Sequence, residues 1–301
     1  CGEETSNRIN GVDYLLRNHR ALIDAGFALN EGAGGVLSED GRPIALQLQA
    51  GEKIHQVYHL EITNPGGHSS RPVPDNAIYR LGAALARVAA LEFPVELNDA
   101  TRGYFRAMGP LVGGETGAAM TRFAQNPADA EAAALLAADP SHNAMMRTTC
   151  VATQLDAGHA ANALPQRARA TLSCRILQGH TPDQVAAILA STIDDNQVAI
   201  TLADRRFGSS PPPLTRQIMG PVERAAARLW PGVAIVPTMT AGASDGRFLN
   251  TAGIPTYGMS GMFSVPGETN AHGLNEKIRV QSLFEGRAFL ESVVREYAMQ
   301  R

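Results

Sequence analysis

Carboxylates in two short segments near the start of the chain could bind a cation and transfer a proton. Glu3 and Glu4 are adjacent and precede an expected helix, and Glu31 follows a short apolar strand. Adjacent carboxylates repel each other, so a pair of this kind is expected where one of them binds a cation and the other exchanges a proton. Glu31, at the end of an apolar strand, is placed where sites are often built.

Two histidines lie in loops rich in small residues. His68 follows Gly66 and Gly67, which allow close approach to a bound molecule, and an imidazole can donate a hydrogen bond to a developing oxyanion. His272 lies in a polar loop before the last expected helix, and histidine is a common metal ligand. No single segment decides the chemistry, so we consider the order in which the segments occur.

Regular elements separate these segments. Apolar spacing predicts a helix over 9–25 and a strand over 27–29, followed by a glycine-rich turn. Further along, the patterns predict a strand over 55–63, a helix over 76–91, strands over 150–156 and 167–177, a capped helix over 181–193 and a strand over 198–203. This β-α-β-β-α-β order is typical of a split-βαβ, ferredoxin-like unit, here with a helical insertion over about 95–148.

The remaining segments predict an α/β layer. Helices are expected over 215–229, after Ser244 and over 280–298, with strands over 234–236 and 254–257. We therefore expect a doubly wound α/β domain formed by residues 1–52 and 208–301, interrupted by an inserted α+β domain over 53–207. A proline-rich stretch at 209–213 is expected to link the two.

Composition excludes several classes of protein. The 301 residues are 44% hydrophobic and 18% charged, with a net charge of −3, which is unlike a basic nucleic-acid-binding protein. No apolar run reaches the roughly 20 residues that span a bilayer. The three cysteines, Cys1, Cys150 and Cys174, match no zinc motif, and we expect them to be buried free thiols. The chain begins at Cys1, inside what reads as a motif, so we expect it to be a fragment. Its compartment, cytoplasmic or exported, stays open.

Six short motifs occur in an order that resembles one enzyme family. They are GEE at 2–4, LNEG at 29–32, GGHSS at 66–70, NALP at 162–165, GASDGR at 242–247 and AHG at 271–273. In this order the chain resembles, over essentially its whole length, the zinc metallopeptidase family of aminoacylases, carboxypeptidases G and S, dipeptidases and succinyl-diaminopimelate desuccinylase. The resemblance implies a doubly wound catalytic domain, incomplete here, interrupted by a dimerisation or lid domain.

The resemblance also implies a metal site. Glu3 matches the family's general base, Glu4 a carboxylate ligand of one zinc, and Glu31 a terminal ligand of the other. His272 matches the C-terminal histidine ligand, and Co²⁺ or Mn²⁺ would suit such ligands as well as Zn²⁺. Gly2 stands where the family motif has aspartate. The family's first histidine ligand and its bridging aspartate would lie upstream of Glu3, so we expect this chain alone to bind zinc poorly and to be nearly inactive.

Residues of the inserted domain complete the implied site. His68 resembles the histidine that reaches the partner subunit's site in a homodimer, and Asn162, Arg175 and Arg247 resemble residues that hold a substrate carboxylate. The implied reaction is hydrolysis of an amide next to a free carboxylate, by a metal-bridged water with a glutamate as base. We expect a peptide substrate, as in a carboxypeptidase or dipeptidase. The alternatives are an N-acyl amino acid amidohydrolase and a non-catalytic, carboxylate-binding dimerisation protein.

Overall fold

The computed structural model describes residues 10–203, 211–271 and 273–299, and the chain packs as two compact units. The first unit comprises residues 1–52, 95–146 and 209–301, and the second comprises residues 53–94 and 147–208. The chain passes from one unit to the other near residues 52, 94, 146 and 208. Residues 95–146, which were expected in the inserted domain, pack in the first unit instead. The roles of the two units, catalytic and dimerising, stay predictions.

A mixed sheet forms the centre of the first unit. Its strands run in the order β1 (Ala28–Asn30), β11 (Thr256–Gly258), β3 (Pro43–Glu52), β2 (Gly35–Leu37) and β12 (Phe263–Ser264), and β10 (Ala234–Thr240) pairs in parallel with β3. The buried side chains of Leu46, Leu48 and Tyr257 pack with Val222 of α9 (Arg216–Leu229) and Phe289 of α11 (Val280–Ala298). The mixed α/β class predicted from the sequence is therefore confirmed.

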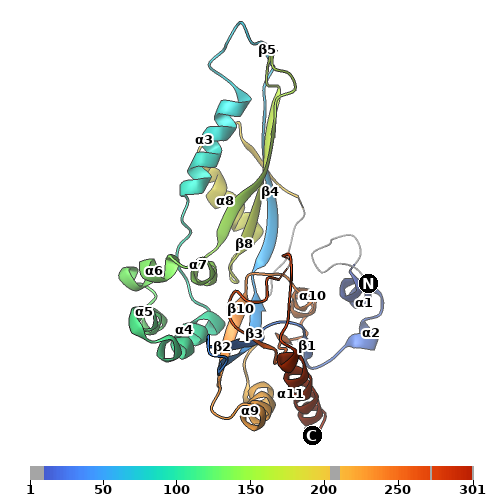
Figure 1. The fold of residues 1–301 in the computed structure, drawn as a ribbon. Helices are drawn as coiled ribbons and strands as arrows, with labels where there is room; N and C mark the ends of the chain where they lie inside the picture. Colours follow the sequence, from blue (N-terminus) through green and yellow to red (C-terminus); the bar gives the residue numbers. More distant parts are fainter. Residues whose placement is uncertain (1–9, 204–210, 272, 300–301) are drawn as a thin grey trace. The chain divides into compact units, whose positions relative to one another are not determined.

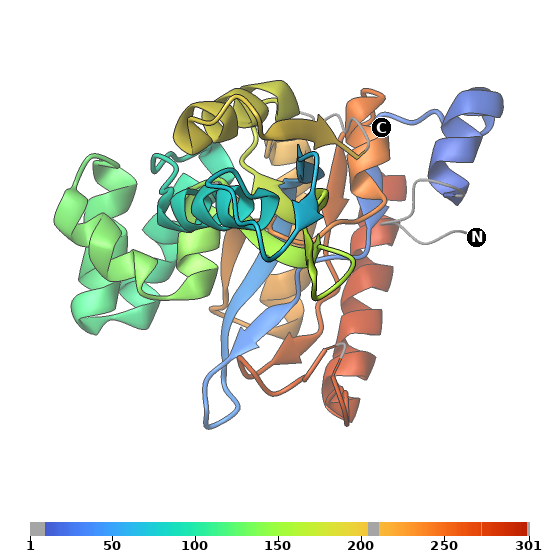
Figure 2. The same cartoon turned by 90° about the horizontal axis from the view of Figure 1, so that it is seen from above.

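Short helices complete the first unit. The helix expected over 9–25 is interrupted at His19, so that α1 (Gly11–Asn18) is followed by α2 (Arg20–Ile23). Helix α10 (Gly246–Thr251) follows the 242–247 motif. Helices α4 (Asp99–Val112), α5 (Gly114–Gln125), α6 (Ala130–Ala137) and α7 (Pro140–Met146) form one green cluster in both views (Figures 1 and 2).

Helix α4 joins this cluster to the sheet of the first unit through its contact with β10. The contact is close at Gly103, where a Cβ atom would lie 2.6 Å from the Pro237 ring. Residues 95–146 belong to the first unit because their buried side chains share a core with sheet residues Ala45 and Val236.

The second unit is a four-stranded antiparallel sheet with helices on one face. The strand order is β6 (Thr149–Ala157), β8 (Arg167–Ile176), β4 (Ile54–Thr63) and β9 (Ala199–Leu202). Alternate residues of β4 and β8 are buried against α3 (Ala77–Ala90) and α8 (Pro182–Ile193). Thr181 and Gln184 form the capping box that begins α8. The predicted split-βαβ unit is confirmed.

The prediction of free thiols at Cys150 and Cys174 is wrong. The two residues face each other in the antiparallel register of β6 and β8 and form a disulfide. Two predicted strands were each known to carry a cysteine, but the register that places the cysteines opposite each other could not be read from the sequence. Among the described residues, no helix is long and apolar enough to cross a bilayer.

Candidate active site

Three of the expected site residues, Glu3, Glu4 and His272, lie outside the described residues. The structure therefore tests the positions of Glu31 and Arg247 in the first unit, and of His68, Asn162 and Arg175 in the second.

A pocket of about 600 Å³ lies within the first unit, next to Glu31. Its walls come from residues 31–33 after β1, from Gln47 and Gln49 of β3, from Pro140 to Met145 on α7, and from residues 238–244 at the end of β10. Among the described residues, Glu31 is the one charged side chain in this lining. A volume of this size is typical of small-molecule sites, so the pocket can accept a neutral group of substrate beside the Glu31 carboxylate.

Glu52, the last residue of β3, holds the loop that carries the 242–247 motif. Its side chain accepts hydrogen bonds from the backbone N of Ser244, at 3.0 Å, and from the Ser244 hydroxyl, at 2.8 Å. Only 8% of Glu52 is exposed, and this burial raises its pKa to about 7. The Ser244 hydrogen bonds and the Arg247 charge oppose that rise, and the Glu31 charge adds to it. Residues from two distant motifs, at 29–32 and 242–247, therefore act on one buried carboxylate.

Further contacts order the same loop. The Ser244 hydroxyl also accepts a hydrogen bond from the backbone N of Gly246, at 3.1 Å. The amide of Asn10 donates to the Asp245 carboxylate at 2.7 Å, which connects the N-cap of α1 to this loop. The guanidinium carbon of Arg247 lies 4.3 Å from the centre of the Phe248 ring, a cation–π contact. Arg247, the second residue of α10, therefore directly follows a loop that is held at several points.

His68 and Asn162 are brought together in the second unit. The short strand β5 (Gly67–His68) pairs with β7 (Ala163–Leu164), and the backbone N of Ser69 donates to the Asn162 carbonyl oxygen at 3.0 Å. Both His68 and Asn162 are exposed. The two motifs that carry these residues, far apart in the sequence, thus form one small polar surface at the end of the sheet.

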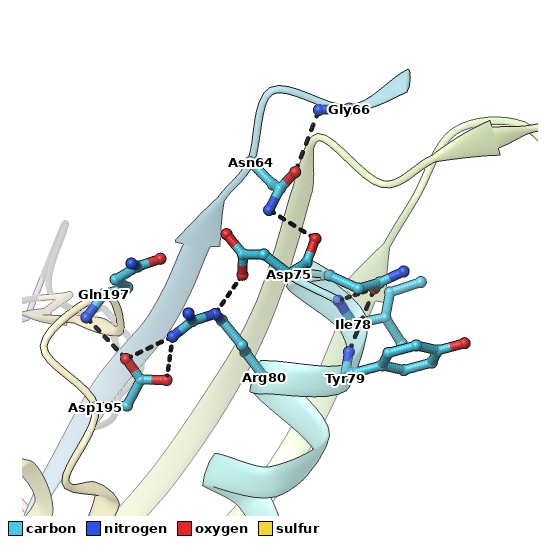
Figure 3. Close-up of polar contacts among 9 residues, drawn as sticks. Asn64, Gly66, Asp75, Ile78, Tyr79, Arg80, Asp195 and Gln197 are labelled. Atoms are coloured by element: carbon cyan, nitrogen blue, oxygen red, sulfur yellow. Dashed lines mark hydrogen bonds and ion pairs between the residues drawn. The ribbon is translucent and has the colours of Figure 1, made fainter. Parts of the chain in front are cut away.

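A network of polar contacts anchors the His68 loop to the rest of the second unit (Figure 3). Asn64, which follows β4, accepts a hydrogen bond from the Gly66 backbone N and donates to the Asp75 carbonyl oxygen. The Asp75 carboxylate pairs with Arg80 of α3 at 2.5 Å, and Arg80 also makes two bonds with Asp195, at 3.0 and 2.8 Å. Both ends of the His68 loop are therefore fixed to α3 and to the segment after α8.

Arg175 lies far from this polar surface within the same unit. The register of β4 and β8 places Arg175 opposite His55, near the start of β4, whereas the His68 loop follows the end of β4. A ten-residue strand is about 30 Å long. Beside Arg175 lies Lys53, which is 2% exposed, and burial together with the Arg175 charge lowers its pKa to about 7. The ammonium of Lys53 donates to the Arg147 carbonyl oxygen at 2.7 Å.

The described residues do not form a metal site by themselves. No group of three or more His, Cys, Asp or Glu side chains suited to a metal occurs among them. Glu31 supplies one carboxylate at the pocket, and the other expected ligands, Glu4 and His272, fall outside the described residues.

Glu52, Lys53 and Ser244 were not singled out by the sequence analysis. Glu52 and Lys53 are adjacent charges at the end of an apolar run, and this pattern is the one signal that could have drawn attention to them. The pairing of Glu52 with Ser244 spans 192 positions and leaves no trace in local spacing.

Comparison with known proteins gives matches over most of the chain. A family model described as a peptidase dimerisation domain matches residues 51–201. The chain is 26% identical over 275 residues to the N-fatty-acyl-amino acid synthase/hydrolase PM20D1.1 of Danio rerio, covering 88% of this chain and 51% of that protein. It is also 26% identical to PM20D1 of Homo sapiens, covering 93% of this chain and 56% of that protein. The chain thus spans about half the length of these curated relatives.

A solved structure shares the fold. The M20 family metallo-carboxypeptidase Sso-CP2 from Sulfolobus solfataricus matches with a TM-score of 0.65 at 18% identity, covering 97% of this chain and 68% of that one. At this identity the match concerns the fold alone.

Proposed function

This chain belongs to the M20 peptidase family, and from that premise we propose that it is part of a metal-dependent hydrolase that cuts an amide bond next to a free carboxylate. One observation carries the proposal. Glu31 and the loop of Ser244, which come from motifs more than 200 residues apart, line a single pocket. Convergence of distant polar residues on one cavity is what an active site requires.

In this proposal the residues of the chain have separate tasks. Arg247 and Arg175 bind the substrate carboxylate, for which a guanidinium is suited because it can donate two parallel hydrogen bonds. Because Asn162 and His68 lie far from Arg175 within one unit, we propose that they act from the partner subunit of a homodimer, where Asn162 assists in that binding and His68 donates a hydrogen bond to the carbonyl oxygen as negative charge develops on it. Glu3 acts as the general base. Glu4, Glu31 and His272 are proposed metal ligands, with zinc as the expected ion and Co²⁺ or Mn²⁺ as alternatives, and the metal would supply an activated water.

The pocket favours an N-acyl amino acid over a peptide with a charged side chain. Apart from Glu31, its described lining is neutral, and Ala144, Met145 and Met239 contribute apolar surface. An acyl group has no charge to compensate and gains free energy when apolar surface is buried. The names of the curated relatives, which include N-fatty-acyl-amino acid hydrolases, support the same choice.

Two experiments test this function: a comparison of two substrate classes, and a substitution that fills the pocket. In the enzyme that contains this chain, we expect faster hydrolysis of N-acyl amino acids than of dipeptides with the same C-terminal residue. Ala144→Phe should place a ring in the pocket and lower kcat/KM for long acyl chains about tenfold or more, because the occupied volume excludes them. Ala134→Phe on the exposed side of α6 is the matched control and should leave kcat/KM unchanged. Equal loss in both variants, or no hydrolysis of either substrate class by the wild type, would contradict the proposal.

We propose further that the protein is a homodimer assembled through the second unit. The family model that matches this region is a dimerisation domain. Strand β6 lies at an edge of the sheet, and its Val151 and Leu155 side chains are 59% and 65% exposed. An exposed apolar edge strand favours pairing with another strand, and a second copy of the chain supplies one.

A further inference from the structure

The His68 ring is held by its own loop through one nitrogen. The backbone N of Ser70 lies 3.2 Å from Nδ1 of His68, and the Ser70 hydroxyl oxygen lies 2.8 Å from the same atom. The His68 carbonyl oxygen in turn accepts a hydrogen bond from the backbone N of Arg71. Nε2, the other ring nitrogen, makes no hydrogen bond with any described residue.

These contacts decide which nitrogen carries the proton in the neutral ring. A hydroxyl can donate or accept, but a backbone N–H group can only donate. Nδ1 of His68 must therefore present its lone pair to Ser70, and the ring proton lies on Nε2. The opposite tautomer would direct two N–H groups at each other and would leave both without an acceptor in this contact.

We propose that Ser70 is a positioning residue that fixes His68 in the Nε2–H tautomer. Through its backbone N–H and its hydroxyl, Ser70 keeps Nδ1 as an acceptor and leaves Nε2 as the donor. The tautomer follows from the contacts alone, whereas the target of that donor, the substrate's carbonyl oxygen, rests on the proposed function. An oxyanion needs a donor, so a ring held in this tautomer requires no rearrangement when charge develops.

The proposal assigns different tasks to two adjacent serines. The backbone N of Ser69 donates to the Asn162 carbonyl oxygen, a contact that does not involve the Ser69 side chain. Ser69→Ala therefore keeps the β5–β7 connection and leaves His68 unchanged. Ser70→Ala removes the hydroxyl and retains the backbone donor, so part of the constraint on Nδ1 is lost. The two variants have the same composition and lie in the same exposed loop.

Long-range ¹H–¹⁵N correlation spectra of the chain labelled with ¹⁵N-histidine test the tautomer directly. His68→Gln identifies the His68 signals among those of the eight histidines. At mildly alkaline pH we expect Nδ1 of the wild type to show the shift of an unprotonated ring nitrogen and Nε2 that of a protonated one. Ser70→Ala should shift both toward the averaged values of a free imidazole, and Ser69→Ala should match the wild type. A protonated Nδ1 in the wild type, or Ser70→Ala spectra identical to those of Ser69→Ala, would overturn the proposal.

A kinetic measurement separates this proposal from the proposed function. In the enzyme that contains this chain, Ser70→Ala should lower kcat about fivefold with little change in KM. The less well oriented His68 ring raises the activation free energy by about 1 kcal/mol, while substrate binding is retained. If the spectra show the expected tautomer but the enzyme hydrolyses no amide, the proposed function fails and the role of Ser70 stands. If the enzyme hydrolyses the amide but the spectra show the opposite tautomer, the proposed function stands and the role of Ser70 fails.

Discussion

The carboxylate of Glu52 accepts hydrogen bonds from both the backbone N and the hydroxyl of Ser244, and so joins the end of β3 to the loop before α10. The other oxygen of the carboxylate, Oε1, is buried without a hydrogen-bond partner among the described residues. One buried group therefore stabilises the loop through its hydrogen bonds and carries a cost whenever it is charged.

Glu52→Gln should change how the stability of the first unit depends on pH. The pKa of Glu52 is raised from 4.5 to about 7, so the folded protein binds a proton that the unfolded chain releases. Wild-type stability should therefore fall as pH rises from about 4.5 to about 7, by at most about 3 kcal/mol. Glutamine can still accept from Ser244 and has no charge to bury, so this fall should disappear. Urea unfolding at pH 5 and pH 8 measures the difference.

The exposed Glu39 provides the control for this experiment. Glu39→Gln should give the wild-type dependence on pH. If the curves of Glu52→Gln and the wild type ran parallel between pH 5 and pH 8, burial of the Glu52 charge would not be the cause.

Lys53→Met should remove a pH dependence of the opposite sign. The pKa of Lys53 is lowered from 10.5 to about 7, so between these values the unfolded chain holds a proton that the folded protein has lost. Stability of the second unit should rise with pH across this window in the wild type and stay level in the variant. Lys277, the other lysine of the chain, is exposed, and Lys277→Met is the matched control. Differential scanning calorimetry at pH 7 and pH 9.5 gives the comparison. If the stability of Lys53→Met still rose between these pH values, the burial of Lys53 would not be the cause.

Loss of the Cys150–Cys174 disulfide should destabilise the second unit. The bond closes a loop between residues 24 positions apart, for which the chain-entropy model gives about 3 kcal/mol. The double variant Cys150→Ala, Cys174→Ala should unfold at a lower urea concentration than the wild type, and its free energy of unfolding should be smaller by that amount. Thiol labelling of the unfolded, non-reduced chain should detect Cys1 alone. Labelling of all three cysteines would show that the bond is absent.

Leu155→Lys should weaken the proposed dimer. A charge on the exposed apolar edge of β6 has to lose water on pairing and opposes addition of a second strand. Sedimentation at increasing dilution should show dissociation at a concentration at least tenfold higher than for the wild type. Thr201→Lys, on β9 at the opposite edge of the same sheet, should behave as the wild type. If only Thr201→Lys dissociated, the pairing edge would be β9.

The second unit was largely predictable because its signals are local. Alternation over 55–63 identified β4, since one face of that strand is buried and the other is not. The cap at Thr181 located the start of α8 to the residue. His68 and Asn162 were each singled out in a separate motif, and their proximity depends on the β5–β7 pairing, which is too short to be predicted.

The central strand of the first unit was missed. In strand β3, apolar and polar residues alternate only from Leu46 to Ala50, and the residues before and after this short segment do not extend the pattern, although most of the strand is buried. The polar residues of this segment, Gln47 and Gln49, both line the pocket. The packing of residues 95–146 in the first unit depends on long-range contacts such as that of Gly103 with Pro237 and could not be read from local patterns.

The wall that α7 contributes to the pocket comes from one uninterrupted stretch of chain, and that stretch contains neither the strands around the pocket nor any proposed catalytic residue. Changes of length or sequence within 95–146 can therefore reshape the cavity while the remaining framework is kept. For protein engineering, this stretch is a replaceable module: exchanging it between relatives should transfer acyl-chain preference from one enzyme to another.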